Sequence, residues 1–195
     1  MPNLAILSGG RSSRLGTNKA LADLNGITVL EYILNRLQPH FSETFIVTNE
    51  PQLYAHYPAR VITDIFPRKG PIAGIHAALK ASSGGPLFVL SCDMLFVNIE
   101  LVEYLFRQAA GYDAVVPVVK GYLQPTAAVY NQSCLQIMTD CLEKDLLKLT
   151  RVFEAIKTRY VDESCLSSFG PLEELFFNIN DAAALQKARE LARRH

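Results

Sequence analysis

Strand-like and helix-like segments alternate along almost the whole chain. Short apolar runs, such as residues 4–7 and 87–91, have the length and composition of buried strands. Segments between them carry apolar residues at helical spacing, and in the segment 28–38 Thr28 and Glu31 have the spacing of a capping box. An alternation of this kind predicts an α/β fold, in which helices cover a mainly parallel sheet.

The other expected elements continue the same alternation. Strands are expected at 44–48, 60–63, 113–118 and 126–130, and near Tyr160 and Phe176. The segment between the strands 113–118 and 126–130 contains Gly and Pro and is expected to be a connecting loop. Helices are expected at 70–81, at 98–110 with Asn98 as the cap, within 131–156, and at 182–193 after a cap at Asp181. No repeat, low-complexity tract or linker divides the chain, and 195 residues is a single-domain length. The sequence therefore predicts one domain, residues 1–195.

The charge balance and the cysteines argue against several classes of protein. Lys plus Arg and Asp plus Glu both number 19, and broad nucleic-acid binding needs an excess of basic residues. The four cysteines form no C-x-x-C pair, so neither a zinc site nor a disulfide framework is expected. The start of the chain lacks the basic region of a signal peptide, and no apolar stretch reaches the roughly 20 residues of a membrane helix. We therefore expect a cytoplasmic protein with no nucleic-acid or membrane partner.

The most informative motif directly follows the first expected strand and reads SGGRSSRLGTNK. Gly9 and Gly10 allow a tight turn that brings backbone N–H groups close to an anion. Arg14 and Lys19 would neutralise a polyphosphate, the arginine with a directional fork of donors. The motif is neither a Walker A loop nor a G-x-G-x-x-G fingerprint. A solvated strand-to-helix turn is the alternative interpretation.

A second candidate is Asp93, which follows the apolar run 87–91 in the sequence SCDM. Ligands of open α/β sheets bind beyond the carboxyl ends of strands. A carboxylate at this place would be a natural ligand for Mg²⁺, which would bridge phosphate oxygens and reduce their repulsion toward an attacking anion. A turn or helix cap is the alternative role for an aspartate after a strand.

Two further groups of polar residues follow expected strands. Asp64 ends one strand, and the sequence KGPIAG then opens a helix, in which Gly74 indicates close packing or close ligand approach; a turn followed by a packed helix is the alternative. In the sequence NIND, strand alternation would place Asn178 and Asn180 on one face, toward the same pocket. Helix capping explains Asp181 equally well.

These motifs together resemble the molybdenum cofactor guanylyltransferases, a family of nucleotidyltransferases. The matching segments are LSGGRSSRLGTNKAL, GPIAGIHAAL, LSCDM, DAVVPV followed by QPTAAVY, and FFNIND, in the family's order over almost the full chain. The resemblance implies a three-layer α/β/α fold of the nucleotide-diphosphate-sugar-transferase type. It also implies Mg²⁺-dependent transfer of GMP from GTP to molybdopterin that carries molybdenum, with release of pyrophosphate.

The resemblance further implies nucleotide contacts in the first half of the chain. Leu7, Ser8 and Gly9 fall where the family contacts the guanine nucleotide. Lys19 falls on the phosphate-binding lysine, and Asn49 on an asparagine that follows the second strand. Ser8 stands where the family usually has alanine, a change that removes neither a charge nor a glycine.

Four more positions carry over from the family. Asp64 falls on an acidic nucleotide contact and Asp93 on the Mg²⁺ ligand. Asn178 and Asn180 fall on asparagines associated with the pterin. The pair Gly9-Gly10 resembles the guanylyl branch, because cytidylyl relatives more often have Ala-Ala-Gly there.

The expected chemistry is an in-line attack of the acceptor's terminal phosphate on the α-phosphorus, which needs positioning and charge neutralisation more than a strong base. Arg14, Lys19 and Asp93 are the expected catalytic residues, and GTP and a molybdopterin-type acceptor are the expected ligands. Cofactor-assembly proteins and apo-molybdoenzymes are candidates for transient contacts. The alternatives are a cytidylyl- or uridylyltransferase with another phosphorylated acceptor, and a non-catalytic nucleotide-binding protein of the same fold.

Overall fold

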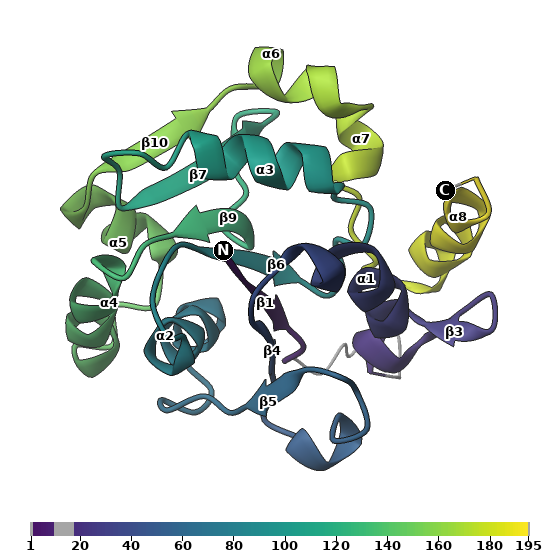
Figure 1. Ribbon diagram of the computed structural model, residues 1–195, viewed down its shortest axis with the longest axis horizontal. Helices are drawn as coiled ribbons and strands as arrows, with labels where there is room; N and C mark the ends of the chain where they lie inside the picture. The colour runs from purple at the N-terminus through teal and green to yellow at the C-terminus, as the bar shows by residue number, and fades with distance from the viewer. Residues whose placement is uncertain (1, 10–17, 195) are drawn as a thin grey trace.

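A mixed eight-stranded sheet lies at the centre of the computed structural model, which describes residues 2–9 and 18–194 (Figure 1). The order of strands across the sheet is β10-β7-β9-β6-β1-β4-β5, and β8 is hydrogen-bonded to β7 off this path. The bounds of these strands are β1 Asn3–Leu7, β4 Thr44–Val47, β5 Arg60–Ile62, β6 Leu87–Ser91, β7 Ala114–Val119, β8 Tyr122–Leu123, β9 Ala127–Tyr130 and β10 Thr158–Val161. A separate small hairpin is formed by β2 (Asp23–Leu24) and β3 (Ile27–Thr28).

Most strands of the sheet run in one direction. β1 is parallel to β4 and to β6, and β5 is parallel to β4. β9 is antiparallel to both β6 and β7, so β7 has the direction of β6, and β10 is parallel to β7. This confirms the mainly parallel sheet that the sequence predicts. From β1 the chain builds outward through β4 and β5, and then returns to place β6 on the other side of β1. The carboxyl ends of β1 and β6 therefore mark a topological switch point, where ligands of such sheets bind.

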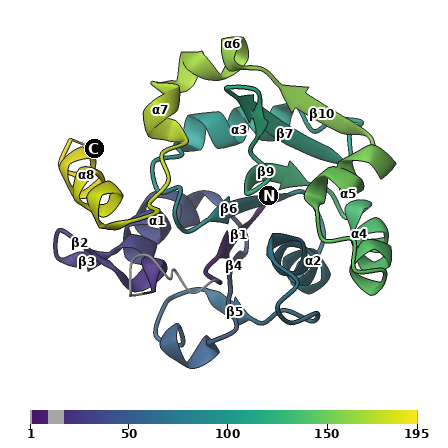
Figure 2. The same cartoon turned by 180° about the vertical axis from the view of Figure 1, so that it is seen from behind.

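Helices cover both faces of the sheet, as expected for three layers. The first group is α1 (Val29–Leu37), α3 (Ile99–Arg107) and α8 (Ala182–Ala192), and the second is α2 (Pro71–Ala81), α4 (Cys134–Glu143) and α5 (Leu149–Ala155). In Figure 1, α1 and α8 lie to the right of the central strands and α2 and α4 to the left, and Figure 2 shows the reverse view. In β1, alternate side chains face opposite sides. Leu4 and Ile6 accordingly pack in the core of the first group, and Ala5 and Leu7 in the core of the second.

Short helical turns connect the larger elements. They are η1 Lys19–Leu21, η2 Gln38–His40, η3 Pro51–Leu53, α6 Glu163–Leu166, η4 Ser167–Phe169 and α7 Leu172–Leu175. In the part of the chain that the structure describes, no helix combines the length and the apolar character that crossing a membrane requires.

The expected helix caps are confirmed. The N–H of Glu31 donates to Thr28 Oγ1 at 3.1 Å, and the N–H of Thr28 donates to Glu31 Oε2 at 2.6 Å, so the capping box is complete. Asn98 caps α3 by accepting the N–H of Leu101 at 3.0 Å, although α3 ends at Arg107 rather than at residue 110. Asp181 caps α8 in the same way.

Two expectations about local structure are wrong. The segment near Phe176 is not a strand, because Pro171 and the acidic first turn of α7 begin a short helix there, and residues 177–180 follow without regular secondary structure. The segment between 118 and 126 is not only a connecting loop. Lys120 (φ 52°) and Gly121 (φ 75°) make a tight turn that pairs β8 with the end of β7.

Candidate functional site

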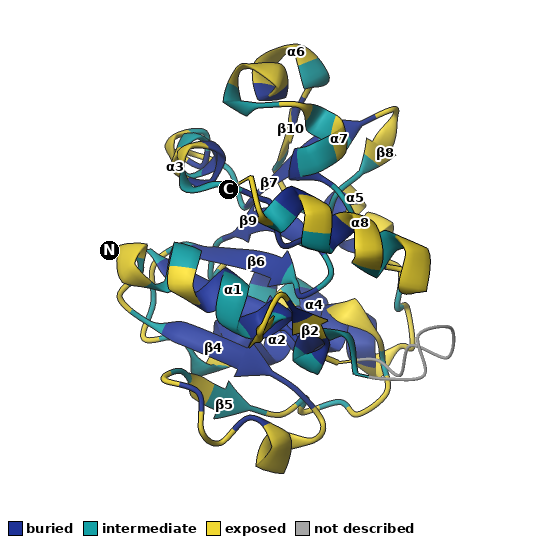
Figure 3. Cartoon of the chain, turned by 90° about the vertical axis from the view of Figure 1, so that its right-hand side faces the viewer, coloured by how far each residue is buried: buried dark blue, intermediate teal, exposed yellow. Residues whose placement is uncertain are grey.

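Four parallel strands end level with one another at one edge of the sheet. Leu7 at the end of β1 is in register with Val47 of β4 and with Ser91 of β6, and Val47 is in register with Ile62 of β5. In Figure 3 the arrows of β4, β5 and β6 all point to the same side. The residues that follow these ends, namely Ser8, Asn49, Asp64 and Asp93, thus follow a common edge although they are far apart in the sequence.

Lys19 lies between Asp93 and Asn180 at this edge. Its Nζ is 3.2 Å from Asp93 Oδ2 and 3.2 Å from Asn180 Oδ1. The side chains of Lys19 and Asp93 are each only 19% exposed, so the ion pair is partly shielded from water. The Lys19 cluster, as we call these three residues, brings one ammonium group and two oxygen acceptors together from three distant segments.

Local structure explains why these segments meet. Lys19 begins η1, and Asn18 caps this turn by accepting the N–H of Ala20 at 3.1 Å. Asp93 lies in the turn after β6, where its carbonyl oxygen accepts the N–H of Ile179 at 3.0 Å. This backbone bond joins the segment before α8 to the turn after β6, and it places Asn180 beside the carboxylate of Asp93.

Asn49 and Asp64 form a second cluster, the Asn49–Asp64 pair, after β4 and β5. Asn49 Nδ2 donates to Asp64 Oδ2 at 3.0 Å. Burial raises the pKa of the half-buried Asp64 carboxyl, and the hydrogen bond from Asn49 acts in the opposite direction. The carboxylate is thus positioned by a neutral amide rather than by a cation.

Gly74 explains how close helix α2 comes to this second cluster. A Cβ atom at Gly74 would lie 3.0 Å from Leu7 Cδ2 and 3.7 Å from Asp64 Oδ1. The first of these distances is tighter than nearly all Cβ contacts in proteins, so a larger residue would require the Leu7 side chain or α2 to shift by a few tenths of an ångström. The close packing that the sequence indicated for Gly74 is therefore present.

A buried tyrosine, Tyr54, joins two segments of the site. Its hydroxyl donates to the carbonyl oxygen of Ser8 at 3.3 Å and accepts a hydrogen bond from Asn18 Nδ2 at 2.8 Å. Burial raises the pKa of Tyr54 to about 12, so the hydroxyl stays protonated near neutral pH. Sequence reasoning missed Tyr54, because a tyrosine after a short turn carries no local signal of contacts made 46 and 36 residues away.

The structure places the remaining predicted residues as follows. Gly10 and Arg14 lie outside the described residues. Asn178 does not share a strand face with Asn180, because the segment is not a strand, and its Nδ2 donates to the Phe176 carbonyl at 3.0 Å instead. Leu7 is buried, and Gly9 is exposed at the end of β1. Ser8 is buried, and its hydroxyl has no hydrogen-bond partner among residues 2–9 and 18–194.

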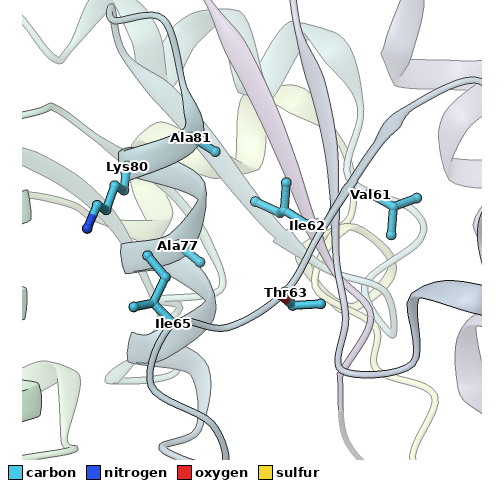
Figure 4. Close-up of a pocket in the computed structure, with 7 residues that line it drawn as sticks. All are labelled: Val61, Ile62, Thr63, Ile65, Ala77, Lys80 and Ala81. Atoms are coloured by element: carbon cyan, nitrogen blue, oxygen red, sulfur yellow. The ribbon is translucent and has the colours of Figure 1, made fainter.

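An open cavity of about 390 Å³ lies between β5 and α2 (Figure 4). Thr63 and Ile65, on either side of Asp64, belong to its lining, but the rest is mainly aliphatic and Lys80 is its one charged residue. The cavity lacks the mixture of cations, carboxylates and amides that a triphosphate with a metal ion requires. We therefore place the candidate site at the two polar clusters. The lining residues are Val61, Ile62, Thr63, Ile65, Ala77, Lys80 and Ala81.

Known proteins are similar to this chain in sequence and in fold. The sequence model of one protein family, the MobA-like NTP transferase domain, matches residues 4–160 of this chain. A probable molybdenum cofactor guanylyltransferase from Pelotomaculum thermopropionicum is 34% identical over 96% of this chain and 91% of its own length.

Solved structures agree with the sequence comparison. The crystal structure of molybdopterin-guanine dinucleotide biosynthesis protein A from Archaeoglobus fulgidus has a TM-score of 0.88 and 31% identity, covering 99% of this chain and 100% of that one. The 2-C-methyl-D-erythritol 4-phosphate cytidylyltransferase of Thermus thermophilus shares the fold alone, with a TM-score of 0.70, 18% identity and coverage of 97% and 98%. The chain therefore belongs to the MobA-like NTP transferases, and within them to the molybdenum cofactor guanylyltransferases, a family of nucleotidyltransferase enzymes.

Proposed function

We propose that this chain transfers GMP from GTP to the terminal phosphate of molybdopterin that carries molybdenum, which yields the guanine dinucleotide form of the cofactor and pyrophosphate. The observation that carries this proposal is the Lys19 cluster, in which a shielded ammonium, a carboxylate and an amide oxygen meet at the switch point of the sheet. The names of the relatives, which describe guanylyltransferases and dinucleotide biosynthesis, support the choice of substrates.

The transfer needs little acid–base chemistry, because the nucleophile is already a phosphate anion. An oxygen of the acceptor phosphate forms a bond to the α-phosphorus of GTP. The bond from this phosphorus to the bridging oxygen of the β-phosphate breaks, and that oxygen takes the electron pair as pyrophosphate leaves. Lys19 would stabilise the negative charge that develops on the leaving group. We assign the same role to Arg14 from the sequence motif.

The donor set of the Lys19 cluster fits Mg²⁺. Asp93 and Asn180 direct two hard oxygens at the same cationic group, each 3.2 Å from the Lys19 ammonium. Magnesium sites in nucleotide enzymes use one or two carboxylates, and substrate phosphates and water complete the coordination. We propose that Asp93 is the metal ligand and that Asn180 orients the acceptor or completes the metal shell. When bound, the ion would neutralise phosphate charge.

The Asn49–Asp64 pair suits the base of the nucleotide. An ionised carboxylate accepts hydrogen bonds only, and guanine offers adjacent donors at its N1–H and its 2-amino group. Asp64 is half-buried and is fixed by Asn49, so it can select for donors at this place. Asp64 would favour guanine over the other bases, together with the backbone of Leu7, Ser8 and Gly9 at the end of β1. The Asn178 side chain is bonded to the Phe176 carbonyl, so Asn178 would support the pterin side only by holding the backbone of its own segment in place.

The family resemblance supports three further proposals. We place the reaction in the cytoplasm. We propose cofactor-assembly proteins as transient partners that share the acceptor, and apo-molybdoenzymes as transient partners that receive the product.

Two assays test the proposed function. Purified protein is incubated with Mg²⁺, molybdenum-loaded molybdopterin and each of GTP, CTP, ATP and UTP, and pyrophosphate and the dinucleotide product are measured. We expect product with GTP alone. In parallel, the same nucleotides are tested for protection against thermal unfolding, because a ligand that binds the native state raises its apparent stability. A preference for CTP would identify a cytidylyltransferase, and protection by GTP without pyrophosphate release would identify a non-catalytic nucleotide-binding protein.

A further inference from the structure

We propose that Tyr54 is a positioning residue of the transfer reaction, because its one hydroxyl ties the end of β1 to the turn that carries Lys19. This inference rests on the proposed function, since it concerns how the same site holds GTP. Tyr54 belongs to none of the motifs that the chain shares with the family.

The contacts of the phenol carry the argument. The hydroxyl donates a hydrogen bond to the Ser8 carbonyl oxygen at 3.3 Å and accepts one from Asn18 Nδ2 at 2.8 Å. Ser8 and Asn18 are the two residues on either side of the sequence from Gly9 to Thr17, which holds the glycines and arginines of the opening motif. One oxygen atom therefore fixes the distance between the two ends of that motif.

The second contact leads directly to Lys19. The side-chain amide of Asn18 uses both of its ends: Nδ2 bonds to Tyr54, and Oδ1 accepts the N–H of Ala20 at 3.1 Å and so caps η1. Lys19 is the first residue of this turn. Since an amide is planar, the bond to Tyr54 also orients the oxygen that caps the turn, and through it the start of the Lys19 side chain.

Tyr54 is itself firmly held, as a positioning residue must be. It is completely buried, and its N–H donates to the Pro51 carbonyl at 3.0 Å. Its ring lies beside that of Tyr57, with 6.1 Å between the ring centroids. The Tyr57 hydroxyl, by contrast, hydrogen-bonds to Thr28 Oγ1 at 3.0 Å, outside the two polar clusters of the site. A buried phenol needs a partner for its O–H, and here Ser8 and Asn18 of the site supply partners, with Thr48 after β4 as a further hydrogen-bonding neighbour.

The chain offers a matched pair of variants. Tyr54→Phe and Tyr57→Phe each remove one hydroxyl from a buried ring in the same short segment, and each breaks a hydrogen bond. Among residues 2–9 and 18–194, the Tyr54 hydroxyl bonds to residues of the site and the Tyr57 hydroxyl bonds to Thr28 instead. If hydroxyl loss acted through stability alone, the two variants would lose activity in proportion to their loss of thermal stability.

We expect Tyr54→Phe to reduce kcat/KM for Mg·GTP on the order of tenfold, the size of effect that one hydrogen bond produces. The KM for the molybdopterin acceptor should change less than twofold, because the contacts of Tyr54 concern the nucleotide side. Tyr57→Phe should retain kcat/KM for Mg·GTP within about twofold. Equal losses of activity in the two variants, or a wild-type kcat/KM in Tyr54→Phe, would overturn the inference.

A second substitution keeps the test decisive if Tyr54→Phe folds poorly. Asn18→Ser retains an oxygen that can cap η1 but removes the donor to Tyr54. We expect kcat/KM for Mg·GTP to fall as much as in Tyr54→Phe. The double variant should be no less active than the more affected single variant, because both substitutions break the same hydrogen bond. Additive losses would contradict the inference. Absence of transfer by the wild-type protein would contradict the proposed function instead, so the two failures are distinguishable.

Discussion

The Lys19 cluster and the Asn49–Asp64 pair lie on the same edge of one sheet but differ in their partners. In the first, the Asp93 carboxylate lies 3.2 Å from the Lys19 ammonium. Asp93 and Asn180 are 74 and 161 positions away from Lys19 in the sequence. In the second, a carboxylate meets a neutral amide at 3.0 Å, and its pKa is raised by burial. The first arrangement suits a ligand with dense charge, and the second suits a neutral ligand with N–H donors. We infer from this difference that the first cluster would hold the triphosphate of a nucleotide and the second cluster its base.

The largest effect should come from the carboxylate of the Lys19 cluster. Asp93→Asn keeps the shape of the side chain but removes the charge proposed to bind Mg²⁺, so kcat for pyrophosphate release should fall by at least about 100-fold. Glu103→Gln, on the exposed side of α3, is a matched control that removes a carboxylate outside the site and should leave kcat unchanged. Near-normal turnover in Asp93→Asn would refute the assignment of the metal ligand.

The ammonium of the same cluster should have the next largest effect. Lys19→Ala removes the proposed stabilisation of the leaving pyrophosphate, and we expect kcat/KM for GTP to fall roughly 30- to 100-fold, with both KM and kcat affected. The comparison variant is Arg151→Ala, which breaks an exposed ion pair with Glu154 on α5. Steady-state kinetics at several GTP concentrations measure both parameters, and unchanged kinetics in Lys19→Ala would count against the phosphate role.

The second cluster should affect the choice of nucleotide more than the rate. Asp64→Asn replaces one acceptor oxygen by a donor group, so it should lower the ratio of kcat/KM for GTP to that for CTP by about tenfold. The kcat at saturating GTP should change less than threefold, in contrast to Asp93→Asn. Competition between GTP and CTP in one reaction measures the ratio. A loss of kcat as large as that of Asp93→Asn would erase the distinction between the two clusters.

The smallest expected effect is a gain in thermal stability, whereas the substitutions above are expected to reduce activity or selectivity. Burial raises the pKa of Asp64, so the folded chain binds this proton more tightly than the unfolded chain does. The ionised carboxylate therefore disfavours folding at neutral pH, and this effect disappears as the pH falls through the raised pKa. Asp64→Asn should raise the Tm at pH 7, with a smaller difference near pH 4. Calorimetry at both pH values measures the change, and a lower Tm at pH 7 would contradict the prediction.

The sequence predicted those parts of the site that depend on strand order and local pattern. Asp93 follows a near-continuous apolar run, and the rule that ligands bind beyond parallel strands locates it at the edge of the sheet. The caps at Thr28 and Asn98 were likewise predictable, since capping needs only residues a few positions apart.

Other parts of the site depend on tertiary contacts that a local pattern does not contain. A strand was expected near Phe176, but the position of this segment is set by the hydrogen bond from the Ile179 N–H to the Asp93 carbonyl. That bond brings Asn180 to Lys19 and leaves Asn178 bonded to its own segment. Tyr54 acts through contacts with Ser8 and Asn18, which become neighbours only when the sheet is formed.

A structure of the chain in complex with Mg²⁺ and a non-reactive GTP analogue would test the division of the edge most directly. The account predicts the metal ion on Asp93, the β- and γ-phosphates within hydrogen-bond distance of Lys19 Nζ, and guanine donors on the Asp64 carboxylate. Guanine bound at the Lys19 cluster, or a metal ion bound away from Asp93, would contradict it.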